Sequence, residues 1–361
     1  MSATGSQIAA IGVAIPSLQL PVENLAEHLS VDPNKYTIGL GCIAQSLCNP
    51  DENHVHLGIR AAKNALKQWG GDVRQIGMLA VGTECALDMA RPLGAWMADA
   101  LDLPEQVRSY EVKHACYAGT LALRQAVEWQ RSGASRGKAA LVICADQAMY
   151  APGHPGEPTQ GAAAVAMILT PEGFADVGLY SYAFQRPAFD FWRPVGDPYP
   201  HVDGPLSVQC YKDAFTSCLE QWKADDEAFF DLESTDVWAM HAPFPKMVQK
   251  GFVAGLSSLG ASEEDALARY QQQVLPTLAW NRRTGNCYTA STWLAFAHAV
   301  AHAQAPQNIA LFSYGSGCGA EILLLRQTQL LPPDFAASVD AQYDAQHILT
   351  AQTYEALRAS Q

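Results

Sequence analysis

The order of the predicted strands and helices indicates an α/β protein built on a mixed, mostly parallel sheet. Two continuous apolar runs, residues 139–145 and 162–169, are typical of strands that are buried on both faces. Strand and helix patterns alternate along the chain, as expected when helices cover a sheet. The same coarse order begins again after residue 170, which indicates a duplicated architecture with two similar halves.

The first half of the chain supplies most of the predicted sheet. Residues 55–69 carry apolar side chains at helical spacing and end at Gly70 and Gly71, a common helix stop. Shorter helices are predicted at 23–30 and 91–100. The predicted strands of this half are 8–14, 76–81, 107–112, 139–145 and 162–169.

The second half repeats the alternation of strands and helices. Its predicted strands are 178–184, 237–240, 309–314 and 321–325, and its predicted helices are 207–222, 245–256, 263–273 and 289–303. The segment 184–205 is rich in aromatic residues and proline and has no regular period, so we expect it to line a pocket. The tail after Pro332 is rich in alanine and glutamine and is expected to be partly helical.

Composition restricts the possible functions. At 361 residues the chain can form two domains or one large α/β unit. Its net charge of -13 argues against a nucleic-acid or anionic-membrane partner, and no stretch is apolar enough for a membrane helix. The nine scattered cysteines form no CxxC pair, which predicts no zinc or other metal site and favours a reducing cytoplasm.

Cys116 lies at a predicted strand-to-helix junction, and we expect it just inside the helix N-terminus. The unpaired N–H groups and partial positive charge of a helix start stabilise an anion there. A thiolate at such a position has a lowered pKa and is the form that attacks carbonyl groups. A buried structural cysteine is the alternative, and position alone leaves both open.

Glu84, Cys116 and His241 all fall at the carboxyl ends of predicted strands. Ligands bind at this edge in open parallel α/β sheets. A cysteine with a histidine and a carboxylate supports nucleophilic acyl chemistry, in which the cysteine carries the acyl group and the other two move protons. Because the chain has ten histidines and 36 acidic residues, a chance grouping stays open at this point.

Residues 111–120, EVKHACYAGT, resemble the nucleophile motif of the 3-hydroxy-3-methylglutaryl-CoA (HMG-CoA) synthases of the thiolase superfamily. Further segments resemble this family in the same order along the chain, several of them most similar to bacterial mevalonate-pathway members. They are residues 31–41, 81–85, 156–161, 190–194, 202–207, 240–247, 283–288 and 312–317.

The resemblance implies a thiolase-like fold with duplicated αβαβα layers. Residues 1–170 would form an N-terminal half that carries Glu84 and Cys116, and residues 171–361 a C-terminal half that carries His241 and ends in a short tail. A cytoplasmic homodimer is also implied, with acetyl-CoA and acetoacetyl-CoA as substrates and no cofactor besides these thioesters.

The resemblance also implies a role for each catalytic residue. Cys116 would take the acetyl group from acetyl-CoA, and Glu84 would remove a proton from its methyl group. The resulting carbon would attack the ketone of acetoacetyl-CoA, which His241 orients and polarises. Glu84 would then return its proton to the new alkoxide, and water would hydrolyse the enzyme thioester to release HMG-CoA.

Four further residues are candidates for substrate binding. Asn286 and Ser316 match family positions near the acetoacetyl group, with turn formation as the alternative. Lys246 is a candidate contact for the CoA phosphates or a solvated helix residue, and Tyr150 reaches the pocket by analogy or packs in the core. Donors for the enolate oxygen are expected from the Cys116 N–H and the loop 315–317.

Three other functions remain open. A related polyketide β-branching synthase performs the same chemistry on acyl-carrier-protein thioesters, although the acidic net charge mildly disfavours an acidic partner. A catalytically silent scaffold would have no physical need for Glu84, Cys116 and His241 together. An initiating ketoacyl synthase would use Cys-His-Asn without a glutamate base.

Overall fold

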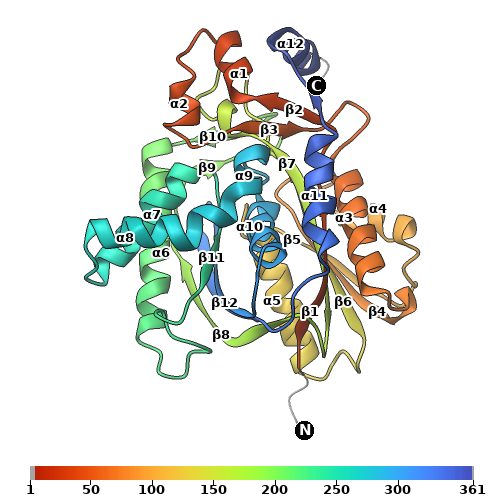
Figure 1. Ribbon diagram of the computed structural model, residues 1–361. Helices are drawn as coiled ribbons and strands as arrows, with labels where there is room; N and C mark the ends of the chain where they lie inside the picture. Colours follow the sequence, from red (N-terminus) through yellow and green to blue (C-terminus); the bar gives the residue numbers. More distant parts are fainter. Residues whose placement is uncertain (1–4, 360–361) are drawn as a thin grey trace.

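The protein is described by a computed structural model that covers residues 5–359. Its largest sheet contains β1 (Gln7–Ala14), β4 (Ile76–Gly82), β5 (Arg108–Val112), β6 (Ala139–Gln147), β7 (Ala162–Thr170), β8 (Ala175–Gln185), β11 (Val237–Met240), β12 (Gln307–Gly315) and β13 (Gly319–Gln327). The strand order is β11-β12-β13-β8-β1-β7-β6-β4-β5, and the sheet runs through the centre of the molecule (Figure 1).

The two halves of this sheet repeat one another. In the first half, β1 pairs antiparallel with β7, β7 antiparallel with β6, and β6 parallel with β4. In the second half, β8 pairs antiparallel with β13, β13 antiparallel with β12, and β12 parallel with β11. The same order and directions in both halves confirm the duplicated α/β architecture. The expected division at residue 170 falls on the last residue of β7.

The sheet is mixed, as expected, but antiparallel pairs outnumber parallel ones. Parallel pairing is found for β4 with β5, β4 with β6, and β11 with β12. A parallel pair needs a long crossover connection, usually a helix. The chain between β12 and β13 is instead a turn of three residues, 316–318, and the chain between β6 and β7 contains only a short 3₁₀ turn, Glu157–Thr159. Continuous apolar character therefore predicted burial correctly but not strand direction.

Helices cover both faces of each half. They are α1 (Val22–His28), α2 (Asn34–Thr37), α3 (His54–Trp69), α4 (Gly94–Met97), α5 (Ala118–Arg131), α6 (Gly204–Lys223), α7 (Pro245–Ser258), α8 (Glu263–Arg269), α9 (Ala279–Thr284), α10 (Thr289–Ala301), α11 (Asp334–Asp344) and α12 (Ala351–Ala359). Figure 1 shows α5 and α10 in the middle, with α3 and α4 on one side and α6 and α7 on the other. This gives the expected αβαβα layers.

Alternate residues of the first-half strands enter different hydrophobic clusters. In β4, Leu79 and Val81 pack in the cluster that contains α3. Met78 and Ala80 pack in the cluster that contains α5 and α10. Because successive side chains of a strand point to opposite faces, a strand between two helix layers must be apolar at every position. This explains the continuous apolar runs in the sequence.

The structure shortens two predicted α-helices and orders one segment that was predicted to be irregular. The predicted helix 91–100 contains Pro92, and α4 begins only after it, followed by a 3₁₀ turn at Asp99–Leu101. The predicted helix 263–273 changes from α8 to a π-helical turn, Tyr270–Val274. The segment 184–205 contains two short paired strands, β9 (Phe191–Trp192) and β10 (His201–Val202).

The C-terminal tail is attached to the N-terminal region by a small second sheet. Its order is β14-β2-β3, formed by β14 (His347–Ile348), β2 (Leu18–Pro21) and β3 (Ala44–Leu47). Leu349, Tyr354 and Leu357 of the tail join Leu20 and Leu25 in a separate buried cluster. The tail is therefore part of the packed structure, and α12 is held beside α1.

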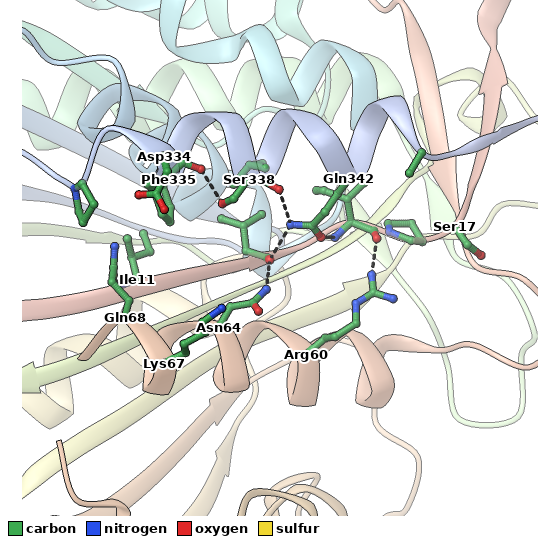
Figure 2. Close-up of a pocket in the computed structure, with 16 residues that line it drawn as sticks. Ile11, Ser17, Arg60, Asn64, Lys67, Gln68, Asp334, Phe335, Ser338 and Gln342 are labelled. Carbon is green, nitrogen blue, oxygen red and sulfur yellow. Dashed lines mark hydrogen bonds between the residues drawn. The ribbon is translucent and has the colours of Figure 1, made fainter. Parts of the chain in front are cut away.

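Side chains from α3 and α11 replace a neighbouring strand along part of β1 (Figure 2). Asn64 and Gln342 donate to the carbonyl of Val13 at 3.0 and 3.2 Å. Gln342 also accepts from the Ile15 N–H at 3.0 Å, and Arg60 donates to the Ile15 carbonyl. These bonds satisfy an otherwise open sheet edge. The groove beside them has a volume of about 740 Å³ and lies apart from Cys116, Glu84 and His241.

We predict that Gly82→Ala lowers the midpoint of thermal unfolding. A Cβ atom on Gly82 would lie 2.4 Å from the Gly119 Cα and 2.5 Å from its nitrogen, where the end of β4 meets the first turn of α5. Backbone atoms cannot move aside cheaply, and overpacking of this kind costs roughly 1–3 kcal/mol. Gly204→Ala is the matched control, because nothing lies within 4 Å of its added Cβ. Equal midpoints for the two variants would contradict this packing.

Candidate active site

Cys116 lies on a sharp turn between β5 and α5. The helix begins at Ala118 with Tyr117 as its N-cap, so Cys116 precedes the helix, and the prediction that it lies inside the first turn is wrong. The residue before it, Ala115, has a φ of 43°, which is unusual for a side chain with a Cβ. The end of β12 packs on this turn so closely that a Cβ on Gly315 would lie 2.4 Å from the His114 carbonyl oxygen.

The side chains of Cys116 and Glu84 are in direct contact. The Cys116 thiol donates a hydrogen bond to Glu84 Oε2, with an Sγ–Oε2 distance of 3.3 Å. Burial, followed by the negative charges of Glu84 and Asp146, raises the pKa of the Cys116 thiol well above its usual value. The expected lowering of this pKa is therefore wrong. Cys116 is a thiol that is hydrogen-bonded to the carboxyl group of Glu84.

Asp146, at the end of β6, connects the two halves beneath this pair. Its carboxylate is fully buried. Oδ1 accepts from the Thr83 hydroxyl at 2.7 Å, the Glu84 N–H at 2.9 Å and the Cys85 N–H at 3.0 Å. Oδ2 accepts from the Thr289 N–H at 3.0 Å and its hydroxyl at 2.6 Å. The main chain that carries Glu84 is thus fixed to the start of α10.

Glu84 is a carboxyl group that favours its protonated form. Burial raises its pKa to about 8, and the negative charge of Asp146 adds to this effect. Such a group is a stronger base than an ordinary carboxylate once it is ionised. It is therefore suited to exchange protons with a thiol and with a carbon acid near neutral pH.

His241 follows the last residue of β11 and is almost fully buried. Its backbone N–H donates to the Phe312 carbonyl at 2.8 Å, and its carbonyl accepts from the Tyr211 hydroxyl at 2.7 Å. Burial lowers the pKa of the imidazole to about 3, so the ring is neutral at physiological pH. Within residues 5–359 its Nδ1 makes no hydrogen bond. A neutral ring can donate from one nitrogen and accept at the other.

A cavity of about 470 Å³ brings most of the predicted site residues together. Cys116, Tyr150, His241, Asn286 and Ser316 line it, and Glu84 is joined to them through Cys116. Its other lining residues are Leu40, His154, Pro155, Gly156, Thr159, Phe191, Val202, Gly204, Pro205, Ser207, Val208, Pro243, Phe244, Met247, Tyr288 and Tyr314. Because Phe191 and Val202 are among them, the segment 184–205 does line a pocket.

Lys246 is placed differently from the other predicted substrate-binding residues. It lines a separate depression of about 260 Å³, together with Arg282. Its ammonium group donates to Gln249 Oε1 at 2.9 Å, and its backbone N–H donates to the carbonyl of Leu40, which lines the main cavity. Lys246 therefore lies beside the cavity that contains Cys116 and outside its lining.

The loop after β12 is held by Asp190, which the sequence alone did not single out. Asp190 is fully buried and accepts from the Tyr314 hydroxyl at 2.7 Å and from the Gly317 N–H at 3.1 Å. Gly317 is therefore already engaged, which leaves the Cys116 and Ser316 N–H groups as the better candidates for an oxyanion. The available signal was its position at the start of residues 190–194, one of the segments that resemble the family.

Asn286 is fixed by local hydrogen bonds, and Tyr150 stacks on a neighbouring ring. The Asn286 amide oxygen accepts from the Tyr288 N–H at 3.0 Å, and its backbone N–H donates to Thr159 at 2.7 Å. Tyr150 stacks on His154 with ring centroids 5.3 Å apart. Tyr288 and His154 were missed by sequence reasoning, since neither has a local pattern that distinguishes it from core.

Within residues 5–359 no group of three or more histidine, cysteine or acidic side chains is arranged to hold a metal ion. Over the same range no helix is long and apolar enough to cross a membrane. All nine cysteines are free thiols.

Two sequence models of one family match the chain. The first, "Hydroxymethylglutaryl-coenzyme A synthase N terminal", matches residues 3–174. The second, "Hydroxymethylglutaryl-coenzyme A synthase C terminal", matches residues 178–259 and 260–358. The chain therefore belongs to the hydroxymethylglutaryl-CoA synthase family, whose members are acyl-transferring enzymes. The expected family and enzyme class are confirmed.

Individual relatives agree with this assignment. Hydroxymethylglutaryl-CoA synthase of Enterococcus faecalis is 34% identical over 316 residues, covering 86% of this chain and 80% of that protein. The solved structure of MvaS in complex with 3-hydroxy-3-methylglutaryl coenzyme A has a TM-score of 0.89 at 34% identity, covering 98% and 91% of the two chains. The curacin pathway HMG synthase in complex with acetyl donor-ACP has a TM-score of 0.90 at 26% identity, covering 98% and 88%.

We predict that Asp146→Asn destabilises the protein and lowers the pKa of Cys116. An asparagine has one acceptor oxygen, so some of the donors that now face the carboxylate would meet its NH₂ group. We expect the free energy of unfolding to fall by about 3 kcal/mol. Loss of the negative charge should move the alkylation of Cys116 by iodoacetamide, followed by mass spectrometry, to lower pH.

Asp225→Asn is the control for this prediction. Asp225 accepts from the Tyr182 hydroxyl at 2.9 Å and does not line the cavity. Its removal should leave the pH dependence of Cys116 alkylation unchanged. An unchanged or upward shift in Asp146→Asn would show that Asp146 does not act electrostatically on Cys116.

Proposed function

We propose that this protein condenses acetyl-CoA with acetoacetyl-CoA and hydrolyses the resulting enzyme thioester to HMG-CoA and CoA. The contact between the Cys116 thiol and Glu84, 3.3 Å long and at a cavity shared with His241, carries the proposal. The three side chains would supply a nucleophile, a base and a neutral hydrogen-bonding ring at one cavity. The family of the chain supports the same reaction.

The first step transfers the acetyl group to Cys116. Ionised Glu84 accepts the thiol proton as the sulfur attacks the thioester carbonyl, and the carbon–sulfur bond to CoA breaks. The proton then passes to the CoA thiolate, which leaves as a thiol. Because the pKa of free Cys116 is raised, this step depends on a base in direct contact with the sulfur.

The second step forms the new carbon–carbon bond. Glu84, ionised again, removes a proton from the methyl group of acetyl-Cys116. Hydrogen bonds from the Cys116 and Ser316 N–H groups would stabilise the enolate oxygen. The enolate carbon attacks the ketone of acetoacetyl-CoA, and the protonated Glu84 returns its proton to the alkoxide. Water then hydrolyses the bond between the acyl group and Cys116, which restores the thiol.

The remaining site residues hold the acceptor. Neutral His241 donates a hydrogen bond to the ketone or thioester oxygen of the acetoacetyl group and polarises it. Asn286 and Ser316 contact the same group from the cavity wall, and Tyr150 packs against it. Lys246, in the neighbouring depression with Arg282, pairs with the CoA phosphates outside the cavity.

A second candidate is the same reaction on acyl-carrier-protein thioesters. The similarity to a curacin HMG synthase solved with a donor carrier protein supports it. Lys246 and Arg282 beside the cavity would suit an acidic carrier protein as well as phosphates. The net charge of -13 mildly disfavours an acidic carrier protein as the partner.

We also propose a homodimer that works in the cytoplasm. Within the described chain, β5 is the last strand of the large sheet and pairs only with β4, so its other edge is available to a second copy. Nine free cysteines favour a reducing compartment.

We predict that the condensation rate rises with pH and levels off above about 8. Below that pH a growing share of Glu84 is protonated and cannot accept a proton, so the rate should fall by roughly tenfold per pH unit. The measurement is kcat at saturating substrate from about pH 6 to about pH 10. Glu220→Gln, at an exposed position, should keep this profile. A kcat that does not change with pH below pH 8 would show that Glu84 is not the base.

We predict that acetyl-CoA and acetoacetyl-CoA together yield HMG-CoA and that Cys116→Ser abolishes acetyl labelling of the protein. Mass spectrometry follows both, alongside the same acyl groups on acyl carrier protein. Product only from carrier-protein substrates would replace the first function with the second. If Cys116 is acetylated but no product forms, the assignment of acetoacetyl-CoA as the acceptor is wrong. If Cys116→Ser still carries the acetyl label, the assignment of Cys116 as the nucleophile is wrong.

A further inference from the structure

The C-terminal helix α12 contacts the outside of the cavity wall. Tyr354 on this helix is buried, and its hydroxyl donates to Glu157 Oε1 at 2.6 Å. The same hydroxyl accepts from Gln160 Nε2 at 2.8 Å. One phenol group therefore joins two buried polar side chains of the segment 150–161, although it lies almost two hundred residues away in the chain.

Glu157 and Gln160 in turn fix the main chain of that segment. Glu157 is almost fully buried, and its other oxygen, Oε2, accepts from the Gly153 N–H at 2.7 Å. Gln160 Oε1 accepts from the Tyr150 N–H at 3.2 Å, and the backbone of Gln160 pairs with that of Asn286 in an isolated β-bridge. Since Tyr150 and Asn286 line the cavity, the hydrogen bonds of Tyr354 lead directly to its wall.

A second residue of α12 contacts two different parts of the enclosure. The guanidinium group of Arg358 donates to the carbonyl of Tyr150. It also lies over the ring of Tyr199 at 5.6 Å, shortly before β10, whose Val202 lines the cavity. The helix thus touches both the segment 150–161 and the aromatic segment 184–205.

The tail that carries these residues is itself firmly attached. β14 pairs with β2 immediately before α12, and Asn24 donates to the Leu349 carbonyl at 2.8 Å. Leu349, Tyr354 and Leu357 are buried against the N-terminal region. In contrast, the main chain of Glu84 is held by Asp146, and Cys116 is hydrogen-bonded to Glu84. The wall and the catalytic pair therefore have separate supports.

We propose that Tyr354 is a positioning residue that sets the shape of the acyl-binding cavity through Glu157 and Gln160, an inference that rests on the proposed function for its substrate. It acts on the fit of the acyl thioester and leaves the chemistry of Cys116 and Glu84 unaltered. The C-terminal helix is thus a functional part of the substrate site.

The test compares Tyr354→Phe with wild type. Phenylalanine keeps the buried ring and removes only the hydroxyl, so the polar pair behind the wall loses its shared partner. We expect KM for the acyl thioester to rise by roughly tenfold while kcat changes by less than about twofold. Hydrogen exchange of residues 150–161, measured without substrate, should become faster.

Tyr182→Phe is the matched control. Tyr182 is also buried, and its hydroxyl donates to a carboxylate, Asp225, far from the cavity lining. It should lose similar stability without a change in KM or in the exchange of residues 150–161. The inference is overturned if Tyr354→Phe keeps the wild-type KM, or if kcat falls as much as KM rises.

The two proposals fail in different ways. If wild-type protein forms no product from any of the thioesters, the proposed function is wrong, and exchange of residues 150–161 still decides whether Tyr354 holds the wall. If wild-type protein is active and that exchange is the same in Tyr354→Phe, the positioning role is wrong and the proposed function stands.

Discussion

The buried carboxylate of Asp146 is the interaction on which the arrangement of the site depends. An isolated charge is costly to bury, and Asp146 meets this cost with donors from both halves of the chain, the residues around Glu84 and the first residue of α10. At the helix start it accepts from N–H and hydroxyl groups that would otherwise lack a partner, because α10 has no side-chain cap of its own. The hydrogen bonds of this one carboxylate therefore join the two halves of the duplicated fold next to Glu84.

Burial, together with the charge of Asp146, raises the pKa of both Glu84 and Cys116. Cys116 lies before the helix and faces two carboxylates, so the stabilisation expected from a helix N-terminus is outweighed by burial and by like charge. The pKa of Glu84 is raised for the same reasons. Both groups therefore hold protons more strongly than usual, and the Cys116 thiol can pass its proton to Glu84 only when Glu84 is ionised.

Local patterns in the sequence predicted what depends on local physics. The apolar runs in β6 and β7, the strand-end placement of Glu84 and His241, and the resemblance around Cys116 all agree with the structure. Strand direction, the hydrogen bonds of Asp146 and the contact of Tyr354 with Glu157 could not be predicted, because they join segments far apart in the chain. Asp146 to Thr289 spans 143 residues and Tyr354 to Glu157 spans 197.

The size of the cavity limits which part of an acyl thioester can enter it. A cavity of about 470 Å³ is in the range of a site for a small ligand, whereas a carrier protein is far too large to enter it. Under the proposed function, Cys116, Glu84 and His241 therefore act on the acyl group at the same place whichever carrier delivers it. We infer that discrimination between carriers is a property of the outer surface, where Lys246 and Arg282 lie. Chemistry and carrier choice can then change independently on one fold.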